Sequence, residues 1–278
     1  MIVAAVQTAS SHNLQENIQK ACQFIQQAAK QGAKLVVLPE NFATLGLPRE
    51  QALKNAETYQ TGPLQQQLAE AAKANQVWVI GGTLPIKASH PGKIFSSCIV
   101  WNDHGESVAR YDKTHLFDVN VTANQAYRES EILMAGNKIV VVPTPFGKIG
   151  LAICYDIRFP ELFRAFMLQG AQIIVLPSAF TVETGTVHWE TLLKARAIEN
   201  LCYLIGAAEV GTRADGRTTY GHSMIVGPWG EILAHQDSGT GVILANIDLV
   251  KLKALREQFP VLSHYQSFVM QALARGNR

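Results

Sequence analysis

Three side chains that could carry covalent chemistry each follow a short apolar run of the sequence. Glu40 follows residues 35–39, Lys113 follows another such run, and Cys154 closes residues 148–154 just before a segment of helical pattern. In α/β sheets, ligands bind where the carboxyl ends of strands meet loops and helix N-termini. We therefore expect a carboxylate, an ammonium and a thiol near the mouth of a sheet.

The thiol of Cys154 is the strongest candidate nucleophile. Its strand is expected to turn sharply into a helix that starts near Pro160, leaving the sulfur exposed at an elbow. The positive end of that helix would favour the thiolate. The alternative is that a cysteine is simply a small buried hydrophobe. We apply this second interpretation to Cys22, Cys98 and Cys202, which lie in apolar surroundings of the sequence.

Glu40 and Lys113 each have an ordinary alternative, as an exposed loop carboxylate and a solvated surface lysine. A carboxylate at the mouth of a buried strand would instead be partly desolvated. Desolvation raises the pKa of a carboxyl group and suits it to accept and return a proton. Lys113 by itself proves little, because its surroundings show neither strand nor helix period.

Eight histidines offer rivals for the role of base. His115, His188 and His222 could each form a pair with the cysteine. No histidine has a partner at the spacing of metal ligands, and no phosphate-binding loop pattern occurs.

Short apolar strands alternate with amphipathic helices along the chain. Asn13 is expected to cap the first helix, with Glu16 as its capping-box partner, and Gly32 to end it. Further helices are expected at 64–75, 160–168, 188–201 and 249–258. Strands are expected at 2–8, 35–38, 77–84, 94–101, 106–111, 139–142, 148–154, 173–176, 202–209, 223–226, 231–234 and 242–247.

The segments 31–39 and 169–177 parallel each other, each reading as helix end, tight turn, buried strand and proline. Any helix–glycine–strand unit could look similar. The alternative is two related halves packed sheet to sheet, an α/β protein with a four-layer α-β-β-α sandwich. Hairpins around 102–105 and 227–230 favour two mixed sheets over parallel ones.

Composition excludes several classes of protein. Hydrophobic residues make up 47% of the 278 and charged residues 17%, which predicts a large core and excludes disorder for most of the chain. The net charge of +2, without a basic run, argues against nucleic acid as partner. No apolar stretch is long enough for a membrane span, and the start lacks the pattern of a signal peptide.

The same composition and linker pattern suggest where the chain works and how it is divided. Four scattered cysteines without a C-x-x-C pair are expected to be free thiols in a reducing cytoplasm. No linker divides the chain, so we expect one domain over residues 1–258. Residues 259–278 are expected to form a tail.

Three segments together resemble the signature blocks of the nitrilase (carbon–nitrogen hydrolase) superfamily. They are Leu-Pro-Glu-Asn at 38–41, Tyr-Asp-Lys-Thr-His-Leu at 111–116, and Cys-Tyr-Asp-Ile-Arg-Phe-Pro-Glu at 154–161. Their order and spacing also match, and the resemblance extends from residue 2 to about residue 259. It implies the same four-layer sandwich and a cysteine-dependent amidase.

The resemblance also implies a role for each residue. Glu40 would take the proton of Cys154, and the sulfur would attack an amide carbonyl. Lys113 and the backbone N–H of Tyr155 would stabilise the oxyanion, and Glu129 would orient Lys113. The products would be an acid and ammonia, released through a thioester, with no metal or cofactor involved.

Further segments resemble the Nit branch of the superfamily, which holds deaminated glutathione amidases and omega-amidases. They are residues 177–180, 184–190, 195–199 and 220–224. The serine in the first segment and the tyrosine and methionine in the last favour the deaminated glutathione amidases. One departure is Thr186-Val187, expected in a loop that could touch substrate.

Both substrate classes are anionic, so a cation should face the site. Arg158 is the candidate, with a salt bridge to Glu161 or Asp156 as the alternative role. The pocket is also expected to be lined by Tyr155, Phe180 and Thr181.

Other functions stay open at this point. They are an omega-amidase, a carbon–nitrogen hydrolase of N-carbamoyl or nitrile substrates, a Cys-His enzyme, an acyltransferase with the same three residues, and a non-catalytic binding protein. The resemblance also implies a homodimer or higher homo-oligomer. The expected helix 160–168 is apolar almost all round, so its outer side would be covered by another chain, with the 259–278 tail across the seam.

Overall fold

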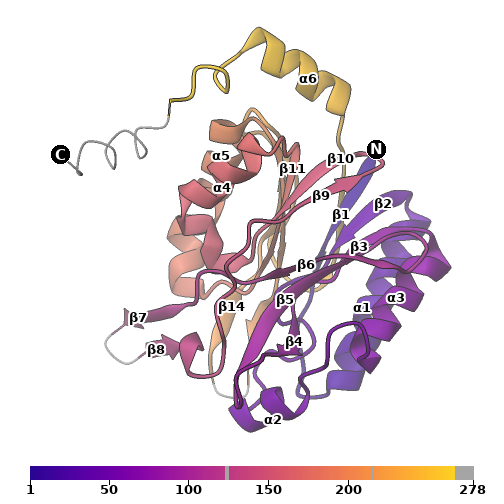
Figure 1. The fold of residues 1–278 in the computed structure, drawn as a ribbon, viewed down its shortest axis with the longest axis vertical. Coiled ribbons are helices and arrows are strands. Elements are labelled where there is room, and N and C mark those ends of the chain that lie inside the picture. The colour runs from indigo at the N-terminus through magenta and orange to yellow at the C-terminus, as the bar shows by residue number, and fades with distance from the viewer. Residues whose placement is uncertain (123–124, 214–215, 267–278) are drawn as a thin grey trace.

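Two mixed β-sheets lie face to face, each with helices on its outer side (Figure 1). The structure is a computed structural model and describes residues 1–122, 125–213 and 216–266. One sheet has the order β17-β1-β2-β3-β5-β4, with β6 paired to β5, and the other has the order β16-β15-β12-β11-β10-β9. The layers confirm the predicted α-β-β-α sandwich.

The first sheet contains β1 (Ile2–Gln7), β2 (Ala33–Val37), β3 (Trp78–Ile80), β4 (Leu84–Lys87), β5 (Ile94–Trp101), β6 (Ser107–Asp112) and β17 (Gly241–Asn246). Strands β1, β2 and β3 are parallel and almost entirely buried, which explains their continuous apolar sequences. Helices α1 (Leu14–Lys30) and α3 (Pro63–Asn75) cover their outer side, and the short α2 (Arg49–Lys54) lies near β4.

The second sheet contains β9 (Val141–Thr144), β10 (Gly147–Leu151), β11 (Ile173–Ser178), β12 (Tyr203–Ala208), β15 (Ser223–Val226) and β16 (Ile232–Gln236). Helices α4 (Pro160–Leu168) and α5 (Val182–Asn200) cover its outer side, and α6 (Leu249–Gln258) follows the last strand. One apolar core fills the seam, which is the space between the two sheets. It includes Val3 and Val37 from the first sheet and Ile149 and Val175 from the second.

Local signals were accurate where a cap or turn fixed an element. Asn13 caps α1 by accepting a hydrogen bond from the backbone N–H of Glu16 at 3.1 Å. The side chain of Glu16 does not complete a capping box, because it binds the Ser11 hydroxyl and the ammonium of Lys20 instead. Both α4 and α6 have their predicted bounds, and both predicted hairpins form.

Several predicted bounds were wrong. The expected strand 77–84 is two strands, because the chain turns at Gly82 in a left-handed conformation (φ 56°), where a side chain would clash with the carbonyl oxygen of Pro39. Helix α5 starts at Val182, six residues before its expected start, because Thr181 caps it. Thr186-Val187 therefore lies in a helix, not in a loop, with Val187 62% exposed.

The argument for an uncovered side of α4 was also wrong. The single chain already buries most large apolar side chains of this helix, namely Leu162, Phe163, Phe166 and Met167. Of its large apolar side chains, Leu168 is the one that is mostly exposed, at 61%. The described part of the 259–278 tail, residues 259–266, lies against the chain's own second half, and residues 267–278 are outside the described range.

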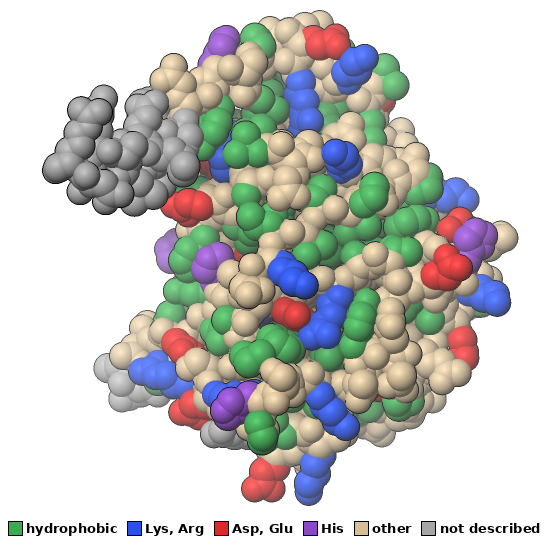
Figure 2. Space-filling model, in the orientation of Figure 1, with side chains coloured by type: hydrophobic (Ala, Val, Ile, Leu, Met, Phe, Trp, Pro, Cys, Tyr) green, Lys and Arg blue, Asp and Glu red, His purple; other side chains and the backbone are tan. Residues whose placement is uncertain are grey.

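The surface agrees with the low net charge. On the face drawn in Figure 2, basic and acidic side chains are interspersed. In the part of the chain that the structure describes, no helix has the length and apolar character needed to cross a bilayer.

Glu209 joins the two sheets at one end of the seam. It directly follows β12 and is fully buried, and it accepts hydrogen bonds from the Thr8 hydroxyl, from the Ser10 N–H at 3.1 Å and from the Ser10 hydroxyl at 2.9 Å. Burial raises the pKa of Glu209 to about 7, although these hydrogen bonds act in the opposite direction.

We predict that Glu209→Gln flattens the dependence of stability on pH. The folded-state pKa of about 7 lies above the ordinary 4.5, so the stabilisation from the protonated carboxyl is complete below 4.5 and is lost as the pH rises through about 7. At pH 8 the variant should exceed the wild type by up to about 3 kcal/mol in free energy of unfolding. Urea unfolding at pH 5 and pH 8 measures this, with the exposed Glu50→Gln as control. An equal loss of unfolding free energy between pH 5 and pH 8 in the wild type and in Glu209→Gln would contradict the prediction.

Candidate active site

Cys154 lies at a sharp turn beyond β10. It is the first residue of a 3-10 turn over Cys154–Arg158, and its φ of 45° lies in the left-handed region. A residue with a Cβ atom is strained there by about 1–2 kcal/mol, and such strain is often found at functional sites. The predicted elbow is present, but its cysteine is only 8% exposed, so the expectation of an exposed thiol was wrong.

The four residues expected to be catalytic converge around one buried ammonium. The Nζ atom of Lys113 lies 2.7 Å from Oε1 of Glu40 and 2.9 Å from Oε1 of Glu129. The side chains of Lys113 and Glu40 are 1% and 3% exposed. Glu40 also forms a hydrogen bond with the thiol of Cys154. Residues from four separate parts of the chain therefore meet at this point.

The charges of this cluster shift one another's proton affinities. Burial raises the pKa of Glu40 above its ordinary value, although the neighbouring Lys113 acts in the opposite direction. Burial alone would lower the pKa of Lys113, but the carboxylates of Glu129 and Glu40 raise it well above its ordinary value. The lysine is thus held in its charged form, and Glu40 has the raised pKa that the sequence predicted.

The thiol differs from expectation. Burial and the charge of Glu40 raise the pKa of Cys154 well above its ordinary value, although Lys113 and the backbone N–H of Ala179 act in the opposite direction. The next regular α-helix along the chain begins only at Pro160, so Cys154 does not lie at its N-terminus. Cys154 therefore needs a base in contact with it, and Glu40 is in that position.

Asp156 holds the cysteine turn against the lysine loop. It is fully buried and accepts four hydrogen bonds, from the hydroxyl of Tyr111 at 2.7 Å, the N–H of Ile153 at 2.8 Å, and the backbone and ring nitrogens of His115 at 3.1 and 2.7 Å. Tyr111 lies two residues before Lys113 and His115 two residues after it. Asp156 thereby sets the distance between Lys113 and Cys154.

A pocket with a cavity volume of about 180 Å³ opens onto the cluster of Glu40, Lys113, Glu129 and Cys154. Its lining includes all four predicted substrate-binding residues, which are Tyr155, Arg158, Phe180 and Thr181. The guanidinium of Arg158 lies 5.7 Å from the ring centroid of Tyr155 and 5.5 Å from that of Phe180. Its polar contact is with His188 at 3.3 Å, so the alternative salt bridge with Glu161 or Asp156 does not form.

Other residues of the pocket were missed by the sequence analysis. The hairpin of β7 (Asp118–Thr122) and β8 (Gln125–Arg128) brings Tyr127 to the pocket and leads into Glu129. The ribbon of β13 (Val210–Thr212) and β14 (Thr218–Tyr220) brings in Arg213 and Arg217. The period-two pattern of 118–128 was the signal that could have revealed the first hairpin.

The three candidate histidines have partners other than the thiol. His115 binds Asp156, His188 contacts Arg158, and His222 lies 3.2 Å from His235. Within the described ranges, none of the three contacts Cys154, so the geometry does not favour a Cys-His pair.

Comparison with known families agrees with this geometry. A model of the carbon-nitrogen hydrolase family matches residues 2–257. The chain belongs to the carbon-nitrogen hydrolase family. This carbon-nitrogen hydrolase is 44% identical over 266 residues to a deaminated glutathione amidase of Synechocystis sp., covering 95% of this chain and 97% of that relative. It is 40% identical to the deaminated glutathione amidase of Bos taurus, covering 95% and 81%.

Solved structures give the same result for the fold. The C. elegans NitFhit protein is 37% identical with a TM-score of 0.88, over 96% of this chain and 65% of that one. Saccharomyces cerevisiae Nit3, a member of branch 10 of the nitrilase superfamily, is 33% identical with a TM-score of 0.84, over 94% of each chain. An amidase from Nesterenkonia sp. AN1, with acrylamide added at its active site cysteine, is 25% identical with a TM-score of 0.76, over 93% and 98%.

Proposed function

We propose that this carbon-nitrogen hydrolase is a cysteine-dependent amidase of small anionic amides, with deaminated glutathione as its substrate. The observation that carries the mechanism is the buried contact of Lys113 with Glu40 and Glu129 beside the thiol of Cys154. The names of the relatives over nearly the full chain support the choice of substrate.

The first step is nucleophilic attack. Glu40 takes the proton of Cys154, and the sulfur forms a bond to the amide carbonyl carbon while the carbonyl electrons move to oxygen. Lys113 and the backbone N–H of Tyr155 stabilise this oxyanion. Because the ammonium of Lys113 is fixed before the reaction, no reorganisation is needed as the charge develops.

The second step expels the amine. The tetrahedral intermediate collapses, the C–N bond breaks, and Glu40 returns its proton to the leaving nitrogen, which leaves a thioester on Cys154. Water then gives a proton to Glu40 and attacks the thioester. The C–S bond breaks and Glu40 returns this proton to the sulfur, which releases the acid and restores the thiol.

Glu129 acts as a positioning residue in this scheme. Lys113 loses the carboxylate charge of Glu40 each time Glu40 holds a proton, and Glu129 remains beside it as a counter-charge. Glu129 is itself held, because its second oxygen accepts the backbone N–H of Phe117 at 2.7 Å.

The pocket supports an anionic substrate. Arg158, Arg213 and Arg217 all line it, and guanidinium groups match carboxylates in geometry and charge.

The expected release of ammonia needs a correction for this substrate. Both amide bonds of the glutathione skeleton are secondary, so hydrolysis frees an amine-terminated peptide or amino acid. Ammonia is expected only for the primary amides of the omega-amidase alternative.

We also propose that the protein is a homodimer in the cytoplasm. Exposed apolar side chains of α5, of the turn between β15 and β16 and of the tail lie near one another, with Ile198 against the turn of Gly230, and Trp229 stacked edge-on with Phe259 at 5.2 Å. Ile198, Trp229 and Phe259 are 47%, 59% and 48% exposed. This patch supports a dimer contact better than α4 does.

A panel of substrates tests the proposed function. We expect the highest kcat/KM for deaminated glutathione. Mass spectrometry of both products, the acid and the released amine, measures the turnover. Arg158→Gln should raise KM at least about tenfold for this anionic substrate, which corresponds to one lost charged hydrogen bond, and should not affect a neutral amide. A higher kcat/KM for 2-oxoglutaramate, 2-oxosuccinamate, nitriles or N-carbamoyl acids would contradict the proposed substrate. Transfer of the acyl group to added amines would make the enzyme an acyltransferase.

Variants of the cluster test the mechanism. Cys154→Ala should abolish turnover, and Lys113→Met should lower kcat by about 10²–10³ or more through loss of the oxyanion donor. Iodoacetamide should label Cys154 before Cys22, because Glu40 beside Cys154 can take its proton as the sulfur attacks, and Glu40→Gln should slow that labelling. The exposed Lys34→Met is the matched control. Near-normal turnover in Cys154→Ala would refute the covalent route, and binding without turnover in the wild type would favour a binding protein.

Light scattering tests the dimer. The wild type should give twice 30.4 kDa or a multiple of it at micromolar concentration. Trp229→Glu should shift the equilibrium to the monomer and lower activity, because α5 follows directly on the pocket residues Phe180 and Thr181. Val108→Glu, at another exposed apolar position, is the control. A fully active wild-type monomer would refute this contact.

A further inference from the structure

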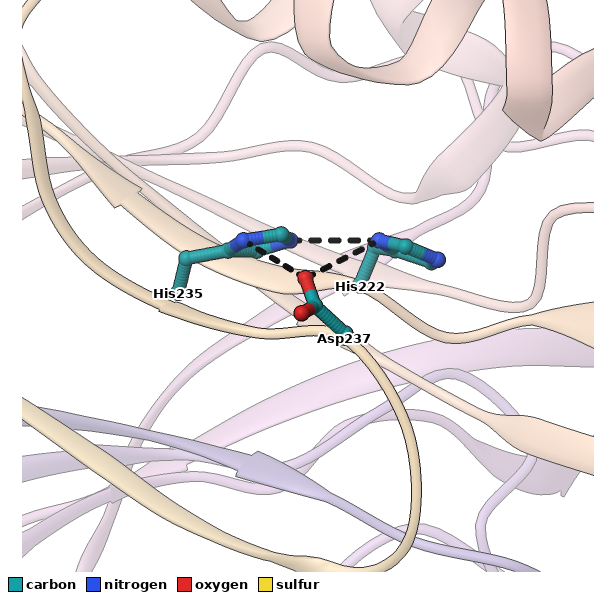
Figure 3. Close-up of side chains that lie close together, drawn as sticks. All are labelled: His222, His235 and Asp237. Carbon is teal, nitrogen blue, oxygen red and sulfur yellow. Dashed lines mark hydrogen bonds and ion pairs between the residues drawn. The ribbon is translucent and has the colours of Figure 1, made fainter.

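Two histidines and an aspartate lie together outside the catalytic pocket (Figure 3). Nδ1 of His222 is 3.2 Å from Nε2 of His235. Oδ1 of Asp237 is 3.1 Å from Nδ1 of His235 and 3.8 Å from Nδ1 of His222. Figure 3 shows the carboxylate oxygen pointing toward the gap between the two rings.

The register of one hairpin produces this cluster. Strands β15 and β16 pair antiparallel with Ser223 opposite Gln236, so the next residues outward, His222 and Asp237, face each other. His235 is the partner of Met224 and lies diagonally beside His222. The cluster therefore lies at the end of this hairpin, with His235 in β16 and with His222 and Asp237 directly beyond the paired strands, although its residues are 13 and 15 positions apart in the sequence.

The ring of His222 is held in place from several sides. Its φ is 58°, a left-handed conformation that a residue with a side chain adopts only where its surroundings enforce it. Its ring stacks on Tyr220, with centroids 3.9 Å apart, and its carbonyl oxygen accepts the indole N–H of Trp189 at 2.7 Å. The two histidine side chains are 27% and 28% exposed, so solvent and ions reach them.

We propose that His222, His235 and Asp237 bind one divalent transition-metal ion, with Zn²⁺ as the representative. Two imidazole nitrogens and one carboxylate oxygen are ligands that such borderline ions prefer over Mg²⁺ or Ca²⁺. Two nitrogens at about 2.0–2.1 Å from a tetrahedral Zn²⁺ are roughly 3.3 Å apart, close to the 3.2 Å in this structure. Water completes the coordination, and the carboxylate lowers the net charge of the site.

The site connects to one wall of the catalytic pocket. Trp189, which holds the carbonyl of His222, packs on Phe180 with ring centroids 4.9 Å apart. The N–H of Tyr220, the residue stacked on His222, donates to the carbonyl of Phe180 at 2.9 Å. A bound ion would therefore stabilise the segment that carries Phe180, without taking part in the reaction.

Calorimetric titration with Zn²⁺ tests the proposal. The untagged Cys154→Ala protein is used as the parent, because the active-site thiol is a competing ligand. We expect one ion per chain and a rise in Tm on binding. His235→Ala and Asp237→Asn should each weaken binding at least about tenfold. His222→Asn should do the same, since asparagine tolerates the left-handed backbone. The exposed turn variant His104→Asn is the matched control.

Co²⁺ spectra separate this site from any remaining cysteine. Nitrogen and oxygen ligation gives weak visible bands without the intense sulfur-to-cobalt charge-transfer band, and the bands should disappear in His235→Ala. The proposal is overturned if Asp237→Asn and His235→Ala bind Zn²⁺ as the parent does, if His104→Asn loses as much affinity as they do, or if the spectrum shows thiolate ligation. Asp237 is 78% exposed, so its substitution leaves the fold intact and the outcome interpretable.

Discussion

The buried contact of one ammonium with two carboxylates is the interaction on which the rest of the site depends. Transferring such charges out of water costs several kcal/mol for each ion, and only close pairing with further hydrogen bonds offsets that cost. Lys113 meets this condition through Glu40 and Glu129, which come from different loops. The loops therefore have little freedom to move apart, and the position of Cys154 relative to Glu40 and Lys113 is fixed with them.

Hydrogen-bonded carboxylates also join the two sheets across an otherwise apolar seam. Asp156 connects the cysteine turn, beyond the second sheet, to Tyr111 and His115 at the end of the first. Glu209 does the same between β12 and the loop after β1. Apolar packing alone would let two flat faces slide, whereas these directional contacts specify one alignment. Because Glu40 and Cys154 belong to opposite sheets, that alignment determines whether a base contacts the thiol.

The sequence predicted the fold class and the meeting of Glu40, Lys113 and Cys154, because strand ends and their flanking residues are local signals. It could not show the electrostatics. The pKa of Cys154 is raised by the burial of the whole turn, which depends on packing between sheets and not on the neighbouring residues in the chain. Asp156 was considered only as a partner of Arg158, since its real partners are about 40 residues away. The histidine cluster was missed because spacing was counted along the chain, and the register that places His222 opposite Asp237 includes an irregularity between Ile225 and Val226 that the predicted hairpin did not contain.

The pairing of β1 with β17 has a consequence for synthesis on the ribosome. Strand β1 leaves the exit tunnel long before its antiparallel neighbour β17, which is the last strand of the described residues, and the amine of Met1 donates to the carbonyl of Ile247 only then. At about 5–20 residues per second, the interval lasts on the order of tens of seconds. Throughout it, one edge of an apolar strand has unpaired N–H and C=O groups, which is a template for joining another nascent chain. Cellular yield should therefore depend on chaperones that shield this edge, and on translation speed through the last part of the message.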